Sequence, residues 1–132
     1  MRVLLDSDFL VGTFRKDDPH HDKTKRILRR LQRKEVELCI TNLVKQESAT
    51  VISHKVSMDA VRQYMITLKQ DVDTVLWIDA ALEARAWKIF LQQTKKGCSF
   101  VDCANLATIE YYKLDGILSF DTFYPIKLRI GQ

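Results

Sequence analysis

The stretch Val3-Leu4-Leu5-Asp6-Ser7-Asp8 opens the chain with an apolar run that passes directly into acidic and polar residues. Three consecutive apolar residues without alternation predict a strand that is buried on both faces, as in the middle of a parallel sheet. We expect Ser7 or Asp8 to cap a short helix that reaches Phe14. The chain therefore begins as a strand followed by a helix.

The same alternation continues along the chain. Further strands are predicted at 36–40, 74–78 and 116–120, and further helices at 22–34, 43–54, 57–69, 79–93 and 99–112. Strands that alternate with helices form a parallel sheet covered on both faces. We expect an α/β fold with three layers, α/β/α, around a central, mostly parallel sheet of about 4–5 strands. No composition shift divides the chain, so residues 1–132 are expected to form a single domain.

Composition excludes several classes of protein. Of 132 residues 46% are hydrophobic and 29% charged, with 4 glycines and 2 prolines, which disfavours disorder. No apolar run approaches the roughly 20 residues of a membrane-spanning helix, and no signal peptide precedes the first strand. Three cysteines without a CxxC pair disfavour a disulfide framework or a zinc site. We expect a soluble, cytoplasmic domain with no membrane association.

The net charge of +4 comes from one segment, residues 22–34, while the rest of the chain is mildly acidic. Ile27, Leu28 and Leu31 give this segment an apolar face, directed at the core or at a partner. Basic side chains on the remaining faces can bind phosphates of a nucleic acid, or form a solvated surface. The residues predicted to bind RNA are Lys23, Lys25, Arg26, Arg29, Arg30 and Arg33.

Three acidic residues stand where surface residues are not expected. Asp6 and Asp121 each follow a buried strand, and ligands of open α/β sheets bind beyond the carboxyl ends of strands. Glu47 lies four residues after Leu43 and four before Val51, so it shares the apolar face of its helix. A buried carboxylate must pair with a base, bind a cation or stand at the lip of a cleft.

A fourth acidic residue, Asp102, has a structural explanation. Ser99-x-x-Asp102 matches a variant of the capping box, which supports the first turn of a helix. That explanation does not extend to Asn105, which lies one turn later beside Leu106 and Ile109 on the inward face. A polar residue there indicates that this helix also faces a site.

With these residues in view, the chain resembles the PIN (PilT N-terminal) domain family over nearly its whole length. The matching segments are Val3-Leu4-Leu5-Asp6-Ser7-Asp8, residues 41–47, Ser99-Phe100-Val101-Asp102-Cys103-Ala104 and residues 117–121. At this size the chain looks most like the toxin halves of bacterial toxin–antitoxin pairs, the VapC type. The resemblance implies an endoribonuclease that depends on Mg²⁺ or Mn²⁺, forms a homodimer and is held inactive by a cognate antitoxin protein.

The resemblance places the family's catalytic acids at Asp6, Glu47, Asp102 and Asp121. Two carboxylates about 4 Å apart repel by about 4 kcal/mol at an effective dielectric near 20, and a bound dication relieves this repulsion. Mg²⁺ takes one or two protein carboxylates and keeps several waters. We therefore expect Asp6 and Asp102 to be the direct metal ligands, and Glu47 and Asp121 to hold metal-bound water or a second ion.

The matched segments also place polar residues around the acids: Ser7, Asp8, Asn105 and Ser119. Ser119 occupies the family's Ser/Thr position two residues before the last acid. Asp8 replaces the Asn or small polar residue of many members, and Asn105 stands where some relatives carry a further acid. One metal position is therefore expected to be weaker in this chain.

Two other functions remain compatible with these residues. Asp6-Ser7-Asp8 after a buried strand also looks like the DxD motif of haloacid-dehalogenase-like phosphatases, although Phe9 and Leu10 replace the usual small continuation and Glu47 would have no purpose. The other alternative is a PIN-fold module that binds RNA or protein without catalysis. An assay of RNA cleavage and an assay of phosphomonoester hydrolysis, both with Mg²⁺, distinguish the nuclease from the phosphatase. A binding module would show neither activity.

Overall fold

A four-stranded parallel sheet forms the centre of the computed structural model, which describes residues 1–131. Its strands are β1 (Arg2–Leu5), β2 (Glu37–Thr41), β3 (Thr74–Leu76) and β4 (Gly116–Leu118), in the order β3-β2-β1-β4. β1 lies in the middle, where Leu4 is opposite Cys39 of β2 and Ile117 of β4. The predicted α/β fold with a parallel sheet is confirmed.

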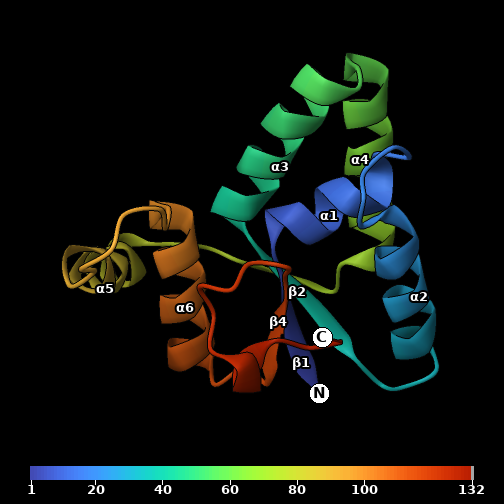
Figure 1. Cartoon of the computed structure of the whole chain (residues 1–132). Helices are drawn as coiled ribbons and strands as arrows, with labels where there is room; N and C mark the ends of the chain where they lie inside the picture. The colour runs from blue at the N-terminus through green and yellow to red at the C-terminus, as the bar shows by residue number, and fades with distance from the viewer. Residues whose placement is uncertain (132) are drawn as a thin grey trace.

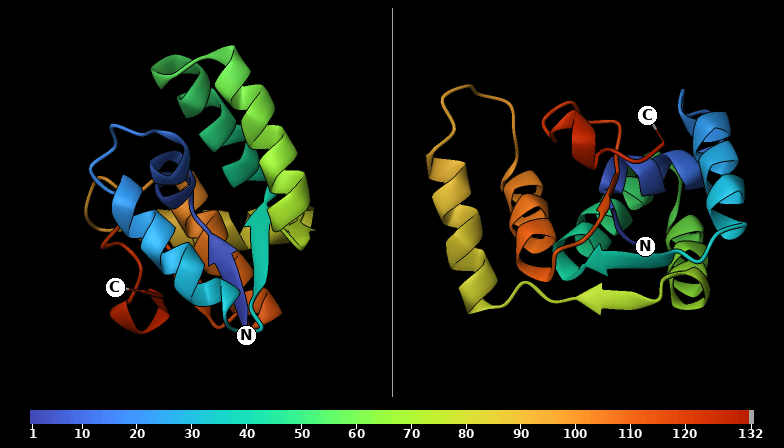
Figure 2. Two further views of the ribbon diagram at one scale, coloured as in Figure 1. Left: turned by 90° about the vertical axis from the view of Figure 1, so that its right-hand side faces the viewer. Right: turned by 90° about the horizontal axis from the view of Figure 1, so that it is seen from below.

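Helices cover both faces of the sheet (Figure 1). They are α1 (Ser7–Phe14), α2 (His21–Gln32), α3 (Asn42–Lys55), α4 (Met58–Asp71), α5 (Ala80–Leu91) and α6 (Phe100–Tyr112), with a 3₁₀ turn, η1 (Ile126–Leu128). α1 to α4 lie over one face, α6 covers the other, and α5 packs outside α6 (Figures 1 and 2). The three layers are therefore as predicted. Within residues 1–131 no helix has both the length and the apolarity to cross a membrane.

Alternating side chains of the strands divide the core into two parts. Val3 and Leu5 pack with residues of α1 to α4, whereas Leu4 points to the opposite face and packs with Ile109 of α6. Successive residues of a strand point to opposite faces, and here both faces are covered by helices. This accounts for the uninterrupted apolar run at the start of the chain.

Two strands are shorter than predicted. β3 ends at Leu76 instead of residue 78, and β4 ends at Leu118 instead of residue 120. Each loses its neighbour at that point, because the adjacent strand turns into a helix. The backbone N–H groups that follow bond to side chains instead: that of Ile78 donates to Asn42 Oδ1 at 2.7 Å, and that of Phe120 donates to Asp8 Oδ2 at 3.0 Å.

The cap of α1 also differs from the prediction. Asp6, not Ser7 or Asp8, is the N-cap, and its carboxylate accepts a hydrogen bond from the backbone N–H of Ser7 at 2.8 Å. β1 ends at Leu5 and α1 begins at Ser7, which leaves a single residue to make the turn. This tight connection carries the Asp6 carboxylate inward to the carboxyl end of the sheet.

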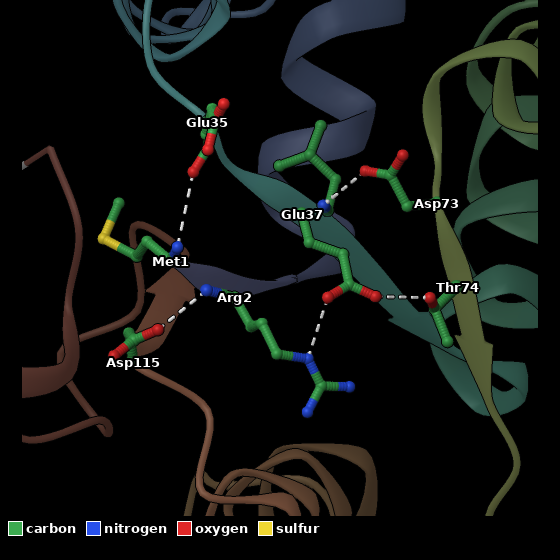
Figure 3. A network of polar contacts seen from close by, with 8 residues as sticks. Met1, Arg2, Glu35, Glu37, Asp73, Thr74 and Asp115 are labelled. Atoms are coloured by element: carbon green, nitrogen blue, oxygen red, sulfur yellow. Dashed lines mark hydrogen bonds and ion pairs between the residues drawn. The ribbon is translucent and has the colours of Figure 1, made fainter.

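Charged and polar residues tie the strands together at their amino ends (Figure 3). Arg2 Nε lies 3.0 Å from Glu37 Oε2, and Thr74 Oγ1 donates to Glu37 Oε1 at 2.7 Å. The backbone N–H of Arg2 donates to Asp115 Oδ2 at 2.7 Å, and Asp73 accepts from the backbone of β2. The carboxylates of Glu37, Asp73 and Asp115 therefore have hydrogen-bond partners at this end of the sheet, and they serve the fold.

The C-terminal segment, left undetermined by the sequence, runs beside β4. The backbone N–H of Ile130 donates to the carbonyl of Ile117 at 2.9 Å. Gly116 is required at this approach, because a Cβ atom there would collide with the carbonyl oxygen of Leu128. The segment brings Tyr124, which is 1% exposed, back over the sheet toward α6.

Candidate functional site

Asp6 is the centre of a polar cluster at the carboxyl ends of β1 and β4. Its side chain is 3% exposed, and both carboxylate oxygens accept hydrogen bonds. Oδ1 accepts from the backbone of Ser7 and from Asn105 Nδ2 at 3.2 Å, and Oδ2 accepts from Ser119 Oγ at 2.7 Å. None of the ion pairs found among residues 1–131 involves Asp6. The carboxylate is thus held in place by neutral donors.

The surroundings of Asp6 disfavour its charged form. Burial, followed by the charge of Asp8, raises the pKa of Asp6 from 3.8 to about 7. The hydrogen bonds from Ser119 and Ser7 lower that pKa, and the charge of Asp102 adds a smaller increase. Desolvation and like charges both act against ionisation, so a nearby cation would stabilise the ionised carboxylate.

Two side chains connect Asp6 to Asp102. Asn105, on α6 and fully buried, donates from Nδ2 both to Asp6 and, at 3.0 Å, to the hydroxyl of Tyr124. Tyr124 in turn donates to Asp102 Oδ1 at 3.2 Å. Asp102 Oδ2 accepts from the backbone N–H of Ser99 at 2.9 Å, which is the predicted capping box. Asp102 therefore caps α6 with one oxygen and faces the cluster with the other.

Asp8 and Asp121 lie on the other side of Asp6, where β4 ends. Ser119 Oγ bonds to Asp6, lies 3.4 Å from Asp8 Oδ2 and accepts from the backbone N–H of Asp121 at 3.0 Å. Burial raises the pKa of Asp8, and the charge of Asp121 raises it further. Asp121 Oδ1 accepts from the backbone N–H of Phe123 at 2.9 Å. Ser119 is thus the residue that joins these three acids.

Glu47 approaches the cluster from α3. It is half-buried between Leu43 and Val51, and its Oε1 accepts a hydrogen bond from Ser7 Oγ. The link to Asp6 is therefore indirect and passes through Ser7, whose backbone N–H bonds to Asp6. The structure thus joins each of the three other predicted acids to Asp6 through neutral polar residues.

The donor set suits a hard dication better than a soft one. The acidic side chains offer only oxygen ligands, and Asp8 Oδ1 and Asn105 Oδ1 are buried without a hydrogen-bond partner among the described residues. Within residues 1–131 no three His, Cys, Asp or Glu side chains lie close enough to form a ready-made metal cage. Mg²⁺ and Mn²⁺ favour oxygen ligands, and Mg²⁺ binds through one or two carboxylates while keeping its waters. The residues present fit such an open site.

The basic helix α2 lies beside this cluster at its first turn. Lys23 Nζ is 5.5 Å from the ring centroid of Phe120, next to Asp121. Thr24, Ile27 and Leu31 are buried, so the apolar face of α2 belongs to the core and not to a partner. The other basic residues predicted to bind RNA extend along the exposed side of the helix, away from its first turn: Lys25, Arg26, Arg29, Arg30 and Arg33.

Two features of the site were missed from the sequence. Tyr124 lies in a tail with no periodic pattern, and no signal distinguishes it from other aromatic residues. His20, which precedes α2, stacks on Phe120 at the edge of the cluster, and no sequence pattern indicates this contact.

Comparison with known proteins agrees with this fold. The family model of the PIN domain matches residues 3–124. The Mycobacterium tuberculosis toxin VapC20, described as cleaving the sarcin-ricin loop, superposes with a TM-score of 0.81 at 21% identity, over 90% of this chain and 89% of that one. A chain of Rickettsia felis VapBC2, solved bound to a promoter DNA fragment, gives a TM-score of 0.70 at 11% identity, over 92% and 88%. No curated protein sequence matches.

Proposed function

The chain belongs to the PIN domain family, and from that premise we propose that it is a metal-dependent endoribonuclease, the toxin of a toxin–antitoxin pair. The observation that carries this proposal is the buried Asp6 carboxylate, joined to Asp102, Asp121 and Glu47 through neutral residues and paired with no basic group within residues 1–131. Such a cluster gains stability when a cation binds, and a nuclease uses that cation on a phosphodiester.

Asp6 and Asp102 would hold the Mg²⁺ or Mn²⁺ ion, since the Asn105–Tyr124 bridge keeps their carboxylates at a set separation. Once bound, the ion would polarise the scissile phosphate and make water easier to deprotonate. Glu47 and Asp121, each less buried than Asp6, can orient the attacking water. Ser7, Asn105 and Ser119 hold these carboxylates in place by the hydrogen bonds described above, and Asp8 completes the negative cluster.

The partners proposed for this chain are RNA, a cognate antitoxin protein and a second copy of itself. The antitoxin is supported by the VapBC2 neighbour, whose name is that of a toxin–antitoxin pair. RNA is supported by the VapC20 neighbour and by the basic face of α2. A hairpin RNA is the first substrate to test, because VapC20 is described as cleaving the sarcin-ricin loop.

Cleavage of a labelled hairpin RNA with Mg²⁺ or Mn²⁺ tests the proposal. We expect cleavage to stop in EDTA, and Asp6→Asn and Asp102→Asn to abolish it while the chain stays folded by circular dichroism. Glu110→Gln, which removes an exposed carboxylate from α6, serves as the matched control and should cleave normally. Full activity in both Asp variants would overturn the assignment of the site.

Among the alternatives, the match to the PIN domain model argues against a haloacid-dehalogenase-like phosphatase. An inactive binding module would bind the hairpin but leave it intact with either metal, so the same assay separates it from a nuclease. Size-exclusion chromatography with light scattering tests the proposed homodimer.

A further inference from the structure

Three aromatic rings, those of Phe9, Phe120 and His20, form a stack at the edge of the acidic cluster. Phe120 stacks on Phe9 with centroids 5.8 Å apart, and the His20 ring lies on Phe120 at 4.0 Å with an angle of 10° between the planes. His20 is the outermost ring of this stack, and the residue is exposed. No second ring within residues 1–131 stacks on His20. A flat aromatic surface is therefore presented to solvent.

The backbone around His20 keeps this ring in position. The backbone N–H of His20 donates to Asp18 Oδ1 at 2.8 Å, and the carbonyl of His20 accepts from Thr24 at 2.9 Å. Nδ1 of the next residue, His21, is bonded to the carbonyl of Gly12 at 2.8 Å, which ties the loop to α1. The ring is thus held by its loop before any ligand arrives, which lowers the entropic cost of binding.

A pocket of about 260 Å³, here called the His20 pocket, joins this ring to the acidic cluster. Its walls include Ser7 and Asp8 from α1, Asp18 and His20 from the following loop, and Val51 and Lys55 from α3. Ser7 is the residue that bonds to Glu47, and Asp8 is bonded to the backbone of Phe120 at 3.0 Å. The pocket therefore opens directly beside the carboxylates proposed to act on a phosphodiester.

The chemistry of these walls suits a nucleotide. An aromatic ring offers a surface on which any base can stack. Lys55 at the pocket and Lys23, whose Nζ is 5.5 Å from the Phe120 ring centroid, supply positive charge for the phosphates of a nucleotide. Aromatic platforms that stack bases act on single-stranded or looped RNA, since bases inside a duplex are already stacked.

We propose that the His20 pocket is a nucleotide subsite, in which one base of an unpaired RNA segment stacks on His20 beside the scissile phosphodiester. This inference rests on the proposed function and adds to it the residue that positions the substrate. It assigns His20 a role in binding RNA, not in the chemistry. It also predicts that unpaired RNA is preferred to duplex.

Binding is measured without cleavage in the Asp6→Asn chain with EDTA, by fluorescence anisotropy of a labelled eight-nucleotide oligoadenylate. We expect His20→Ala to weaken binding by about tenfold, the size of one lost base–aromatic stack. His20→Phe and His20→Trp keep a ring and should bind within about threefold of the parent. His20→Lys keeps a cation without a ring and should bind as poorly as His20→Ala. Tyr111→Ala, which removes an exposed ring near the far end of α6, is the control.

Several outcomes overturn the subsite: unchanged binding by His20→Ala, rescue by His20→Lys but not by His20→Phe, and no binding of the oligoadenylate by the parent. Hairpin cleavage by the otherwise unmodified chain is measured in parallel. Cleavage with unchanged binding in His20→Ala rejects the subsite and leaves the nuclease in place. Ring-dependent binding without cleavage rejects the nuclease and supports the subsite. The two proposals therefore fail separately.

Discussion

The side-chain amide of Asn105 donates to Asp6 Oδ1 at 3.2 Å, a contact between residues 99 positions apart in the sequence. A neutral donor lies here against a carboxylate that other acids already surround. Because the same amide also bonds to Tyr124, one residue sets the separation of Asp6 from Asp102. The charge of residue 105 therefore affects the electrostatic repulsion among the carboxylates of the cluster.

Asn105→Asp should destabilise the metal-free chain by about 2–4 kcal/mol at pH 8, since a hydrogen bond is lost and a further like charge is added. Mg²⁺ should recover part of that loss by neutralising the added charge. Urea unfolding in EDTA and in Mg²⁺ measures both effects. Asn105→Ala removes the hydrogen bond without adding charge, so its loss should not respond to Mg²⁺. An equal loss for Asn105→Asp under both conditions would contradict the prediction.

Stability should fall with rising pH because of Asp6. Its folded-state pKa of about 7 is above the ordinary value of 3.8, so the folded chain holds this proton more tightly than the unfolded chain. Stability from this group is therefore complete below about pH 4 and is lost as pH rises to about 7, by at most about 4 kcal/mol. We expect Asp6→Asn to remove this loss in EDTA.

Urea unfolding at several pH values, with the wild-type and Asp6→Asn curves subtracted, isolates the contribution of this carboxyl. Glu110→Gln, at an exposed carboxyl of α6, should leave the slope of stability against pH unchanged. Parallel wild-type and Asp6→Asn curves from pH 4 to pH 8 would show that Asp6 titrates normally.

Tyr124→Phe should lower RNA cleavage by about tenfold, because Asp102 loses the hydroxyl that orients it, and should cost about 1 kcal/mol of stability for the lost hydrogen bond. Tyr64→Phe is the matched control. Tyr64 is also buried, and its hydroxyl bonds to the hydroxyl of Ser48 and not to a carboxylate. Urea unfolding should find similar losses for the two variants, while the kcat/KM for a hairpin substrate falls in Tyr124→Phe alone. Equal activity of the two would remove Tyr124 from the site.

Arg29→Glu combined with Arg30→Glu should weaken RNA binding and flatten its dependence on salt. Each phosphate contact with single-stranded RNA contributes about 0.7 to the slope of log affinity against log salt concentration, so two lost contacts should lower it by about 1.4. The same charge change at Arg85 and Lys88 on α5 is the control, since Arg85 lies over Tyr111 at the far end of α6. Equal slopes for the two double variants would exclude α2 from RNA binding.

Local patterns were sufficient to predict the order and type of the helices and strands. Thr41 and Asp79 cap the helices that begin next to them, and such caps can be found from sequence because capping depends on residues within one turn. The ends of β3 and β4 were predicted too late, because a strand ends where its neighbour leaves the sheet. That event is decided elsewhere in the chain, at Asn42 and Asp6, and no local pattern reports it.

The sequence was sufficient to predict that Asp6 and Asp121 approach each other, because the topology of the sheet determines their placement. Parallel strands bring their carboxyl ends to one edge, so acids that follow strands 1 and 4 were expected to approach each other. The bonds that join these acids were not predictable, because they depend on side-chain reach across long sequence separations. Tyr124 and Ser119 act through such bonds, over 22 and 113 positions, respectively.

Tyr124 bonds to Asp102 from the C-terminal segment, which follows all four strands of the sheet in the sequence and pairs with β4. During synthesis, a ribosome-bound chain can fold β1, β2 and most of the helices before this residue leaves the exit tunnel. The Asp102 carboxylate gains its bond to Tyr124 only once this residue has emerged. Under the proposed function, the site is therefore completed by one of the last segments of the chain to be synthesised.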